Sequence, residues 1–352
     1  MFSQQVSWYK VDLDETALGP DIVKLLSGYS GISEPEQPAH IKSIRNEAWQ
    51  TFPFPCIGQF MFLRLRLSTY SFYPRLLSYL SQAADKDKPP PLFLDLGACL
   101  GQEVRKLAFD GVPVSQLFMA DRFIGYKTCA ARLFRDADGL GDNYMLFDVF
   151  APGSQGLGER CLDGRFSVVA LVNVLHLFGY DDQVRICCRV VTELLLQKEE
   201  VVIVGSQMAA TSKGGPVKLP GAVDDHDGGG GRGRGLIATR DQLDKNELQQ
   251  IDHDKKAFHM MAKVLLPTEE TEVEERKSGE VMKAFDGTAP SKQSKELFAH
   301  DVTSFNLFWE DVGKACGGVK FNVNAHMVPM VDEGLGMWER DSKWLVFWVE
   351  RI

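Results

Sequence analysis

The sequence predicts a doubly wound α/β fold built on a mostly parallel, seven-stranded sheet. Three observations predict it. Short apolar segments alternate with segments of helical spacing between residues 92 and 204, glycines follow the first apolar segment, and two more strand-like segments close the chain. Repeated β-α units place parallel strands side by side with helices on both faces. A closing pair of strands then supplies an antiparallel last strand.

Residues 1–85 are expected to form a helical N-terminal segment that caps the site. Apolar residues recur at helical spacing between Asp21 and Leu80, with proline and glycine between them. The stretch Asp85–Pro91 is charged and then proline-rich, which suits a linker. The core is therefore expected to begin at residue 86.

The first part of the core is expected to span residues 86–208. Each expected strand is a short apolar run, and each expected helix keeps apolar residues three or four positions apart. The strands are Leu92–Leu96, Leu117–Ala120, Tyr144–Phe147, Phe166–Val172 and Val201–Val204, and the helices are Gln102–Phe109, Tyr126–Phe134 and Asp181–Leu196.

The alternation stops at residue 209. Residues 209–295 have little apolar periodicity, a glycine run at Gly228–Gly231 and dense mixed charge between Glu269 and Lys277, so we expect a disordered, low-complexity insertion. The Arg-Gly repeat Arg232–Gly235 is too short, and too close to acidic residues, to favour a nucleic-acid contact over a solvated loop. Residues 296–352 are expected to complete the core with a helix, Phe305–Val312, and strands Phe321–Val328 and Trp344–Val349.

Composition excludes several classes of partner. The 48 acidic and 39 basic residues give a net charge of −9, which does not favour nucleic acid. No apolar run reaches the ~20 residues of a membrane span, and no leader is evident, so a cytoplasmic protein is expected. Seven scattered cysteines lack C-x-x-C spacing, so neither a metal site nor a disulfide framework is expected. The sequence does not determine the oligomeric state, and a homodimer is compatible with it.

The turn after the first core strand, Asp95–Gly101, carries the strongest chemical signal. A dinucleotide site needs G-x-G-x-x-G, but Cys99 stands at the second glycine and Gln102 at the third. NAD(P) or FAD therefore fits poorly. S-adenosylmethionine has no pyrophosphate and tolerates a side chain at that position. An ordinary strand-to-helix turn is the alternative for this motif alone.

Acidic residues at two further strand ends strengthen the case. Asp121 follows the second strand and Asp148 the third, so both are expected to meet Asp95 in one crevice at the carboxyl edge of the sheet. Asp121 would accept the ribose hydroxyls and Asp148 the adenine amino group. The remaining residues predicted to bind S-adenosylmethionine are Gly97, Gly101, Gln102, Val149 and Asn173. The pattern as a whole predicts a Rossmann-like methyltransferase.

Longer stretches resemble a family of fungal methyltransferases from meroterpenoid and polyketide biosynthetic clusters. They are Trp8–Lys10, Leu25–Ile32, Ile44–Trp49, Pro53–Gly58, Asp95–Gly97 with Gly101 and Gln102, Arg105–Leu107, Phe109–Gly111, Leu175–Phe178, and Ser304 and Phe305 with Trp309, Val312 and Gly313. The resemblance implies O-methylation, including methyl-ester formation, of a small aromatic or terpenoid molecule. The sequence departs from the family at Ala98 and Leu100, where cysteine and an aromatic residue are commoner, and in the length of its insertion.

The acceptor side offers weaker signals. His176 follows the fourth strand and is a candidate general base, although a structural histidine is equally compatible. A carboxylate acceptor needs no base, whereas a phenol with a pKa near ~10 would gain from one. The candidate substrate-binding residues are Tyr9, Arg45, Trp49, Phe54 and His300, with Arg45 expected to bind an acidic group.

Two rival functions remain at this point. One is an NAD(P)-dependent Rossmann oxidoreductase, which the Cys99 position disfavours. The other is a catalytically silent binding protein that keeps the methyltransferase fold, because fold alone does not fix function.

Overall fold

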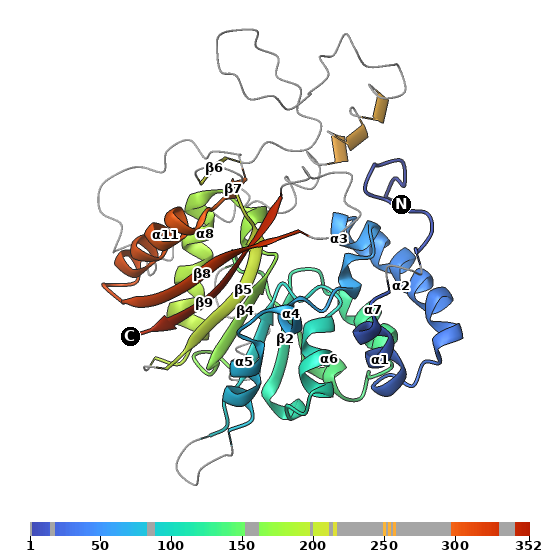
Figure 1. Cartoon of the computed structure of the whole chain (residues 1–352), viewed down its shortest axis with the longest axis horizontal. Helices are drawn as coiled ribbons and strands as arrows, with labels where there is room; N and C mark the ends of the chain where they lie inside the picture. Colours follow the sequence, from blue (N-terminus) through green and yellow to red (C-terminus); the bar gives the residue numbers. More distant parts are fainter. Residues whose placement is uncertain are drawn as a thin grey trace.

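A seven-stranded sheet with strand order β3-β2-β1-β4-β5-β9-β8 forms the centre of the computed structural model (Figure 1). The structure describes residues 2–14, 18–82, 89–151, 162–197, 200–210, 214–216, 249–250, 253–254, 256–257, 297–330 and 342–352. The strands are β1 (Phe93–Leu96), β2 (Leu117–Asp121), β3 (Tyr144–Leu146), β4 (Val168–Val172), β5 (Val202–Met208), β8 (Phe321–Pro329) and β9 (Lys343–Arg351).

Strands β1 to β5 pair in parallel, and β9 runs antiparallel to both of its neighbours. This confirms the predicted mostly parallel sheet with an antiparallel last strand. The connecting helices are α6 (Gln102–Phe109), α7 (Gly125–Phe134), α8 (Tyr180–Arg189) and α11 (Val302–Ala315). The helix expected to reach Leu196 changes at Val190 into a π-helical turn that ends at Leu194.

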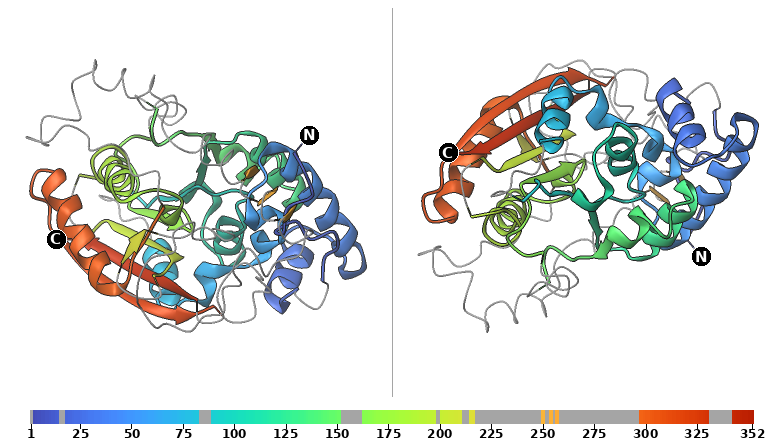
Figure 2. Two further views of the ribbon diagram at one scale, coloured as in Figure 1. Left: turned by 90° about the horizontal axis from the view of Figure 1, so that it is seen from above. Right: turned by 90° about the horizontal axis from the view of Figure 1, so that it is seen from below.

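The two faces of the sheet belong to two hydrophobic clusters. Successive strand residues point to opposite faces, so Phe93 of β1 joins one cluster and Leu94 the other. The first cluster contains residues of α6 and α7, and the second contains residues of α8 and α11. Helices therefore cover both faces, as a doubly wound fold requires (Figures 1 and 2).

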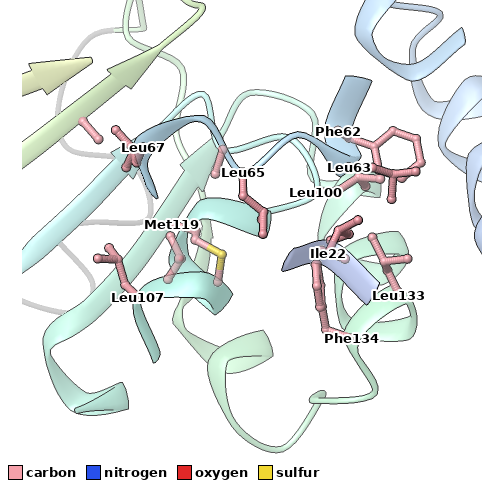
Figure 3. Packing of buried hydrophobic residues seen from close by; sticks show 14 of the residues in the cluster. Ile22, Phe62, Leu63, Leu65, Leu67, Leu100, Leu107, Met119, Leu133 and Phe134 are labelled. Atoms are coloured by element: carbon pink, nitrogen blue, oxygen red, sulfur yellow. The ribbon is translucent and has the colours of Figure 1, made fainter. Parts of the chain in front are cut away.

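The N-terminal helices pack into the first cluster. They are α1 (Pro20–Gly28), α2 (Gln37–Thr51), α3 (Pro55–Gly58), α4 (Arg66–Thr69) and α5 (Tyr73–Leu80). Figure 3 shows Ile22 of α1 and Phe62 gathered near Leu100, with Leu107 of α6 and Met119 of β2 close by. Figure 2 places α1 and α2 at the end of the molecule away from β8 and β9. The N-terminal segment thus shares one hydrophobic core with the sheet.

The ends of the expected insertion meet. The short strands β6 (Gly215–Pro216) and β7 (Phe298–Ala299) pair antiparallel, and the N–H of Ala210 donates to the carbonyl of His300 at 2.9 Å. Most of residues 209–295, including the glycine run and the Arg-Gly repeat, lies outside the described residues. Where this segment is described it contacts the N-terminus, because Gln250 donates to the carbonyl of Gln5 at 2.9 Å and Asp254 accepts the N–H of Ser7 at 3.0 Å.

Two further observations apply to the described part of the chain. No helix in it is long and apolar enough to span a membrane. Its cysteines are all free thiols, and no group of three or more histidine, cysteine, aspartate or glutamate side chains is arranged there to hold a metal ion.

Candidate functional site

A cavity of about 240 Å³ lies beyond the carboxyl ends of the parallel strands. Residues that follow β1, β2, β3 and β4 form its floor, and Met208 at the end of β5 closes one side. The N-terminal segment supplies the opposite wall. Its residues there are Phe54, Pro55, Cys56, Met61, Phe62, Arg64 and Arg66. Ligands in open α/β sheets bind at this edge.

The glycine loop after β1 is held in a fixed conformation. Gly97 has φ +80°, and a Cβ there would lie 2.6 Å from Cγ2 of Val174. The N–H of Gly97 donates to the carbonyl of Ala120 at 2.8 Å, which fastens the loop to β2. Gly101, with φ +66°, caps α6 and does not line the cavity. Cys99 adopts φ +51°, a conformation that favours glycine, at the position where a dinucleotide motif has its second glycine.

Asp121 ends β2 and is almost fully buried beside this loop. Its Oδ2 accepts the N–H of Cys99 at 3.0 Å, and its Oδ1 accepts the N–H of Phe123 at 2.9 Å. Burial raises the pKa of Asp121 to about 6, although these hydrogen bonds favour the charged form. The carboxylate therefore supports the loop and faces the cavity at the same time.

Asp95 and Glu103 are two further acidic residues in the cavity wall. Burial raises the pKa of Asp95 well above its usual range, and the neighbouring charges of Glu103 and Asp121 raise it further. Burial also raises the pKa of Glu103 to about 7. Two buried carboxyl groups close together favour a bound cation or hydrogen-bond donors beside them.

Asp148, the third acid expected from the strand ends, also lines the cavity, together with Val149. Its Oδ2 lies 2.9 Å from Nε of Arg122, and its Oδ1 accepts the N–H of Phe150 at 2.9 Å. The structure thus brings the three acids predicted from the strand ends to one cavity. It also shows an arginine partner on Asp148 that the sequence did not suggest.

Asn173 and His176 follow β4 and also line the cavity. Asn173 has φ +59°, and its N–H donates to the carbonyl of Ser206 at 2.7 Å. His176 lies in a 3-10 turn, Leu175–Leu177, and its Nδ1 accepts the N–H of Met208 at 3.5 Å. Burial and, to a smaller extent, the charge of Arg66 together lower the pKa of His176 to about 4.

The structure places only some of the expected substrate-binding residues at the cavity. Phe54 lines the cavity, whereas Tyr9, Arg45 and Trp49 do not. Arg45 is fully buried, donates to the carbonyls of Val11 at 3.0 Å and Gly58 at 3.3 Å, and lies 4.2 Å from the centre of the Tyr9 ring. Its guanidinium serves the packing of the N-terminal segment, which corrects the expectation that it binds an acidic acceptor.

His300 is also placed away from the cavity. It is fully buried, with Nε2 at 3.1 Å from Oε1 of Gln183 and Nδ1 at 3.3 Å from Oγ of Ser304. Aromatic rings of Phe298, Phe305 and others surround it. His300 is therefore a histidine of the hydrophobic core, whereas we expected it to lie on the acceptor side of the cavity.

Several cavity residues could not be recognised in the sequence. Arg66, Glu103 and Trp344 come from three distant segments. The only sequence signal among them is Glu103, an acidic residue in the first turn of a predicted helix directly after the glycine loop.

The sheet order, the antiparallel β9 and a ligand cavity after β1 define a Rossmann-like methyltransferase fold. Comparison of the sequence with known proteins leads to the same class. Residues 8–63 match the model of the meroterpenoid methyltransferase N-terminal domain. O-methyltransferase phiE of Fungal sp. (strain ATCC 74256) is 35% identical over 60% of this chain and 68% of its own length.

Two more relatives extend the comparison. O-methyltransferase atr3 of Stereocaulon alpinum is 35% identical over 63% of this chain and 62% of its own length. Asnovolin E/Chermesin D methyltransferase nvfJ of Aspergillus novofumigatus (strain IBT 16806) is 33% identical over 51% of this chain and 61% of its own length. The match thus spans slightly under two thirds of these two relatives. The chain belongs to this family of fungal biosynthetic methyltransferases.

Proposed function

We propose that the chain is an S-adenosylmethionine-dependent O-methyltransferase that acts on a small aromatic or terpenoid acceptor. The observation that supports it most is the convergence of Asp95, Asp121 and Asp148 on one cavity beside a glycine loop in a methyltransferase fold. The names of the relatives support O-methylation. The proposed cofactor residues are Asp95, Gly97, Gln102, Asp121, Asp148, Val149 and Asn173, with Gly101 shaping the loop.

The residues present suit this cofactor. Oε1 of Gln102 is buried in the cavity wall and has no hydrogen-bond partner in the structure, so it is an acceptor for a ligand amino group. The carboxylate of Asp121 has two oxygens for a pair of vicinal hydroxyls. Gly97 lets the loop pack closely on Val174, because a Cβ there would lie 2.6 Å from Cγ2 of that residue. Cys99 blocks the close approach that a pyrophosphate needs.

Bound S-adenosylmethionine supplies a sulfonium methyl group, and the chain positions the acceptor oxygen. His176 is neutral at pH 7, because its pKa is about 4. Since its Nδ1 accepts the N–H of Met208, we assign the ring proton to Nε2. His176 is then a hydrogen-bond donor to the acceptor oxygen and a poor base. Aromatic residues such as Phe54 and Phe123 keep water away from that oxygen.

A two-part experiment tests this function. Calorimetric titration compares S-adenosylhomocysteine with NADP⁺, and mass spectrometry then follows methyl groups from labelled S-adenosylmethionine into acceptors in an extract of the producing cells. We expect tight binding of S-adenosylhomocysteine alone and a product that gains one methyl group on oxygen. Binding of NADP⁺ in its place would support the oxidoreductase. Cofactor binding without any methylated product would support the silent binding protein.

A further inference from the structure

Helices α8 and α11 lie side by side on one face of the sheet (Figure 1). At the start of α8, the centre of the Tyr180 ring lies 5.7 Å from that of Phe308, and the Tyr180 hydroxyl donates to Asp311 at 2.8 Å. In the last turn of α8, Sγ of Cys188 lies 4.0 Å from the carbonyl oxygen of Val312. Residues four positions apart share one face of a helix. Cys188, two such steps after Tyr180, therefore also faces α11.

Cys316 follows directly after α11, on the side of the helix that carries Val312. Its N–H donates to the carbonyl of Val312 at 2.9 Å, so Cys188 and Cys316 both contact the same carbonyl group. Both side chains pack against the second hydrophobic cluster and stay partly exposed. Cys187, by contrast, is fully buried. The packing of the two helices thus brings together two accessible cysteines that are distant in the sequence.

The thiols of this pair interact directly and have different acidities. A hydrogen bond from Cys316 lowers the pKa of the Cys188 thiol, and burial opposes that effect. The same hydrogen bond raises the pKa of the Cys316 thiol, as do burial and the charges of Cys188 and Cys187, while the charge of Arg351 lowers it. Cys188 is therefore the thiolate of the pair, and Cys316 is its hydrogen-bond donor.

We propose that Cys188 and Cys316 are a redox modification site, at which a low-molecular-weight disulfide such as glutathione disulfide converts the two thiols into one intramolecular disulfide. The Cys188 thiolate attacks one sulfur of glutathione disulfide, forms a mixed disulfide and releases one glutathione thiolate. Cys316 then gives its proton to solvent and attacks the Cys188 sulfur, which forms the bridge and releases the second glutathione. Two protein thiols are oxidised in all, and one glutathione disulfide is reduced to two thiols.

The bridge joins α8 to α11 across the expected insertion, because Cys188 precedes residues 209–295 and Cys316 follows them. A cross-link that closes so long a loop stabilises a protein mainly by restricting its unfolded chain. Neither cysteine lines the cavity. Oxidation should therefore raise the thermal stability and leave ligand binding unchanged, so this inference does not depend on the proposed function.

Peptide mapping of the folded full-length chain tests the inference. The chain is equilibrated with reduced and oxidised glutathione near neutral pH, quenched with acid, alkylated and digested, and the disulfides are located by fragmentation in a mass spectrometer. The variants are Cys188→Ser, Cys316→Ser and Cys187→Ala, of which the last is the matched control at the adjacent position. A parallel sample of the wild-type chain is oxidised in concentrated urea.

We expect a bridge between Cys188 and Cys316 in the wild-type chain and in Cys187→Ala, with a Tm that rises by about 5 °C on oxidation and returns with dithiothreitol. Cys316→Ser should stop at a mixed disulfide of glutathione on Cys188. Cys188→Ser should react at least about tenfold more slowly, because it lacks the thiolate. In urea the preference for this bridge should be lost.

Three outcomes would overturn the inference. They are a folded wild-type chain in which both thiols stay reduced, a bridge from Cys187 in place of Cys188, and a Tm that does not rise on oxidation. The wild-type map decides alone if a variant does not fold. Titration with S-adenosylhomocysteine should give equal affinities for the reduced and oxidised chains. Failure of both to bind it would count against the proposed function and leave the thiol pair unaffected.

Discussion

The carboxylate of Glu103 accepts the backbone N–H of Arg66 at 2.8 Å. Glu103 lies in the first turn of α6, directly after the glycine loop, and Arg66 begins α4 in the N-terminal segment. One buried carboxyl group therefore connects the helix that follows the glycine loop to a residue of the N-terminal segment that lines the same cavity. The N-cap residue of α4, Leu65, makes no side-chain cap hydrogen bond, so Glu103 supplies the side-chain acceptor for the first two N–H groups of this helix.

The first prediction concerns this contact. Glu103→Ala should leave two buried N–H groups without an acceptor and lower the free energy of unfolding by about 1–3 kcal/mol, measured by urea denaturation. Glu36→Ala is the control, because Glu36 caps an exposed turn with Ser33 and should cost less. Equal losses in the two variants would show that Glu103 is no more than an ordinary cap.

The second prediction concerns Asp121. Asp121→Ala removes the proposed charge-assisted bonds to the ribose and two bonds to the loop backbone, so affinity for S-adenosylhomocysteine should fall by about 1.5–3 kcal/mol in calorimetry. Asp142→Ala, an exposed acid on the turn Leu140–Asn143, should leave affinity unchanged. Wild-type affinity in the Asp121 variant would remove this residue from the cofactor site.

The third prediction separates the two roles of His176. If it donates from Nε2, His176→Gln should lower kcat by no more than about tenfold, and raising the pH should not restore the rate. A true base would cost on the order of 10²–10⁴-fold and be partly rescued at high pH. Steady-state kinetics of the variant between pH 6 and 9 distinguish these outcomes, once a methylated acceptor is in hand.

The fourth prediction is a pH dependence of stability. Burial lowers the pKa of His300 to about 4 from 6.5. Between pH 4 and pH 6.5 the histidine of the unfolded chain binds a proton that the folded chain does not bind. The contribution of His300 to the free energy of unfolding is therefore complete above pH 6.5, and it declines by about 3 kcal/mol in all as the pH falls toward 4. Denaturation of wild type and His300→Gln at pH 7 and pH 5 should show a smaller decline in the variant. Parallel declines would mean that His300 is protonated in the folded chain.

The convergence of three acidic residues on one cavity could be predicted from the sequence because it depends on local order. Asp95 lies next to the last residue of β1, Asp121 ends β2 and Asp148 follows β3, and parallel strands end at the same edge. A strand signal and the next acidic residue therefore suffice to place each carboxylate. The repeated β-α units likewise predicted the parallel strands, and the closing pair of strand signals predicted the antiparallel last strand.

The acceptor half could not be predicted, because it depends on packing between distant segments. Arg45 and Arg66 lie in the same helical segment and have the same chemistry, yet one guanidinium meets backbone carbonyls and the other borders the cavity. The partner of Arg66 in the cavity wall is the Trp344 ring, which β9 brings opposite the end of β5. No periodicity within the N-terminal segment contains that information.

The last prediction concerns the expected insertion, whose two ends are joined by the β6–β7 pair. Gly215 stands opposite Ala299 and Pro216 opposite Phe298, so replacing residues 217–296 with Asn-Gly, which forms a three-residue loop together with Leu297, should close the pair as a short hairpin. The described contacts that would be lost are the hydrogen bonds of Gln250 with Gln5 and of Asp254 with Ser7, worth about 1 kcal/mol each, and the packing of the small Ala257 side chain against the first cluster. Tm should therefore fall by only a few degrees.

A second deletion gives the matched comparison. Replacing residues 214–299 with the same turn removes the pair itself and the N-terminal neighbour of His300, so it should lower Tm further and reduce soluble yield. Affinity for S-adenosylhomocysteine should stay at the wild-type value in the shorter deletion, because the proposed cofactor residues all lie before β5. A collapse of the 217–296 deletion to unfolded protein, seen by calorimetry and circular dichroism, would show that the segment packs on the core and is more than a low-complexity insertion.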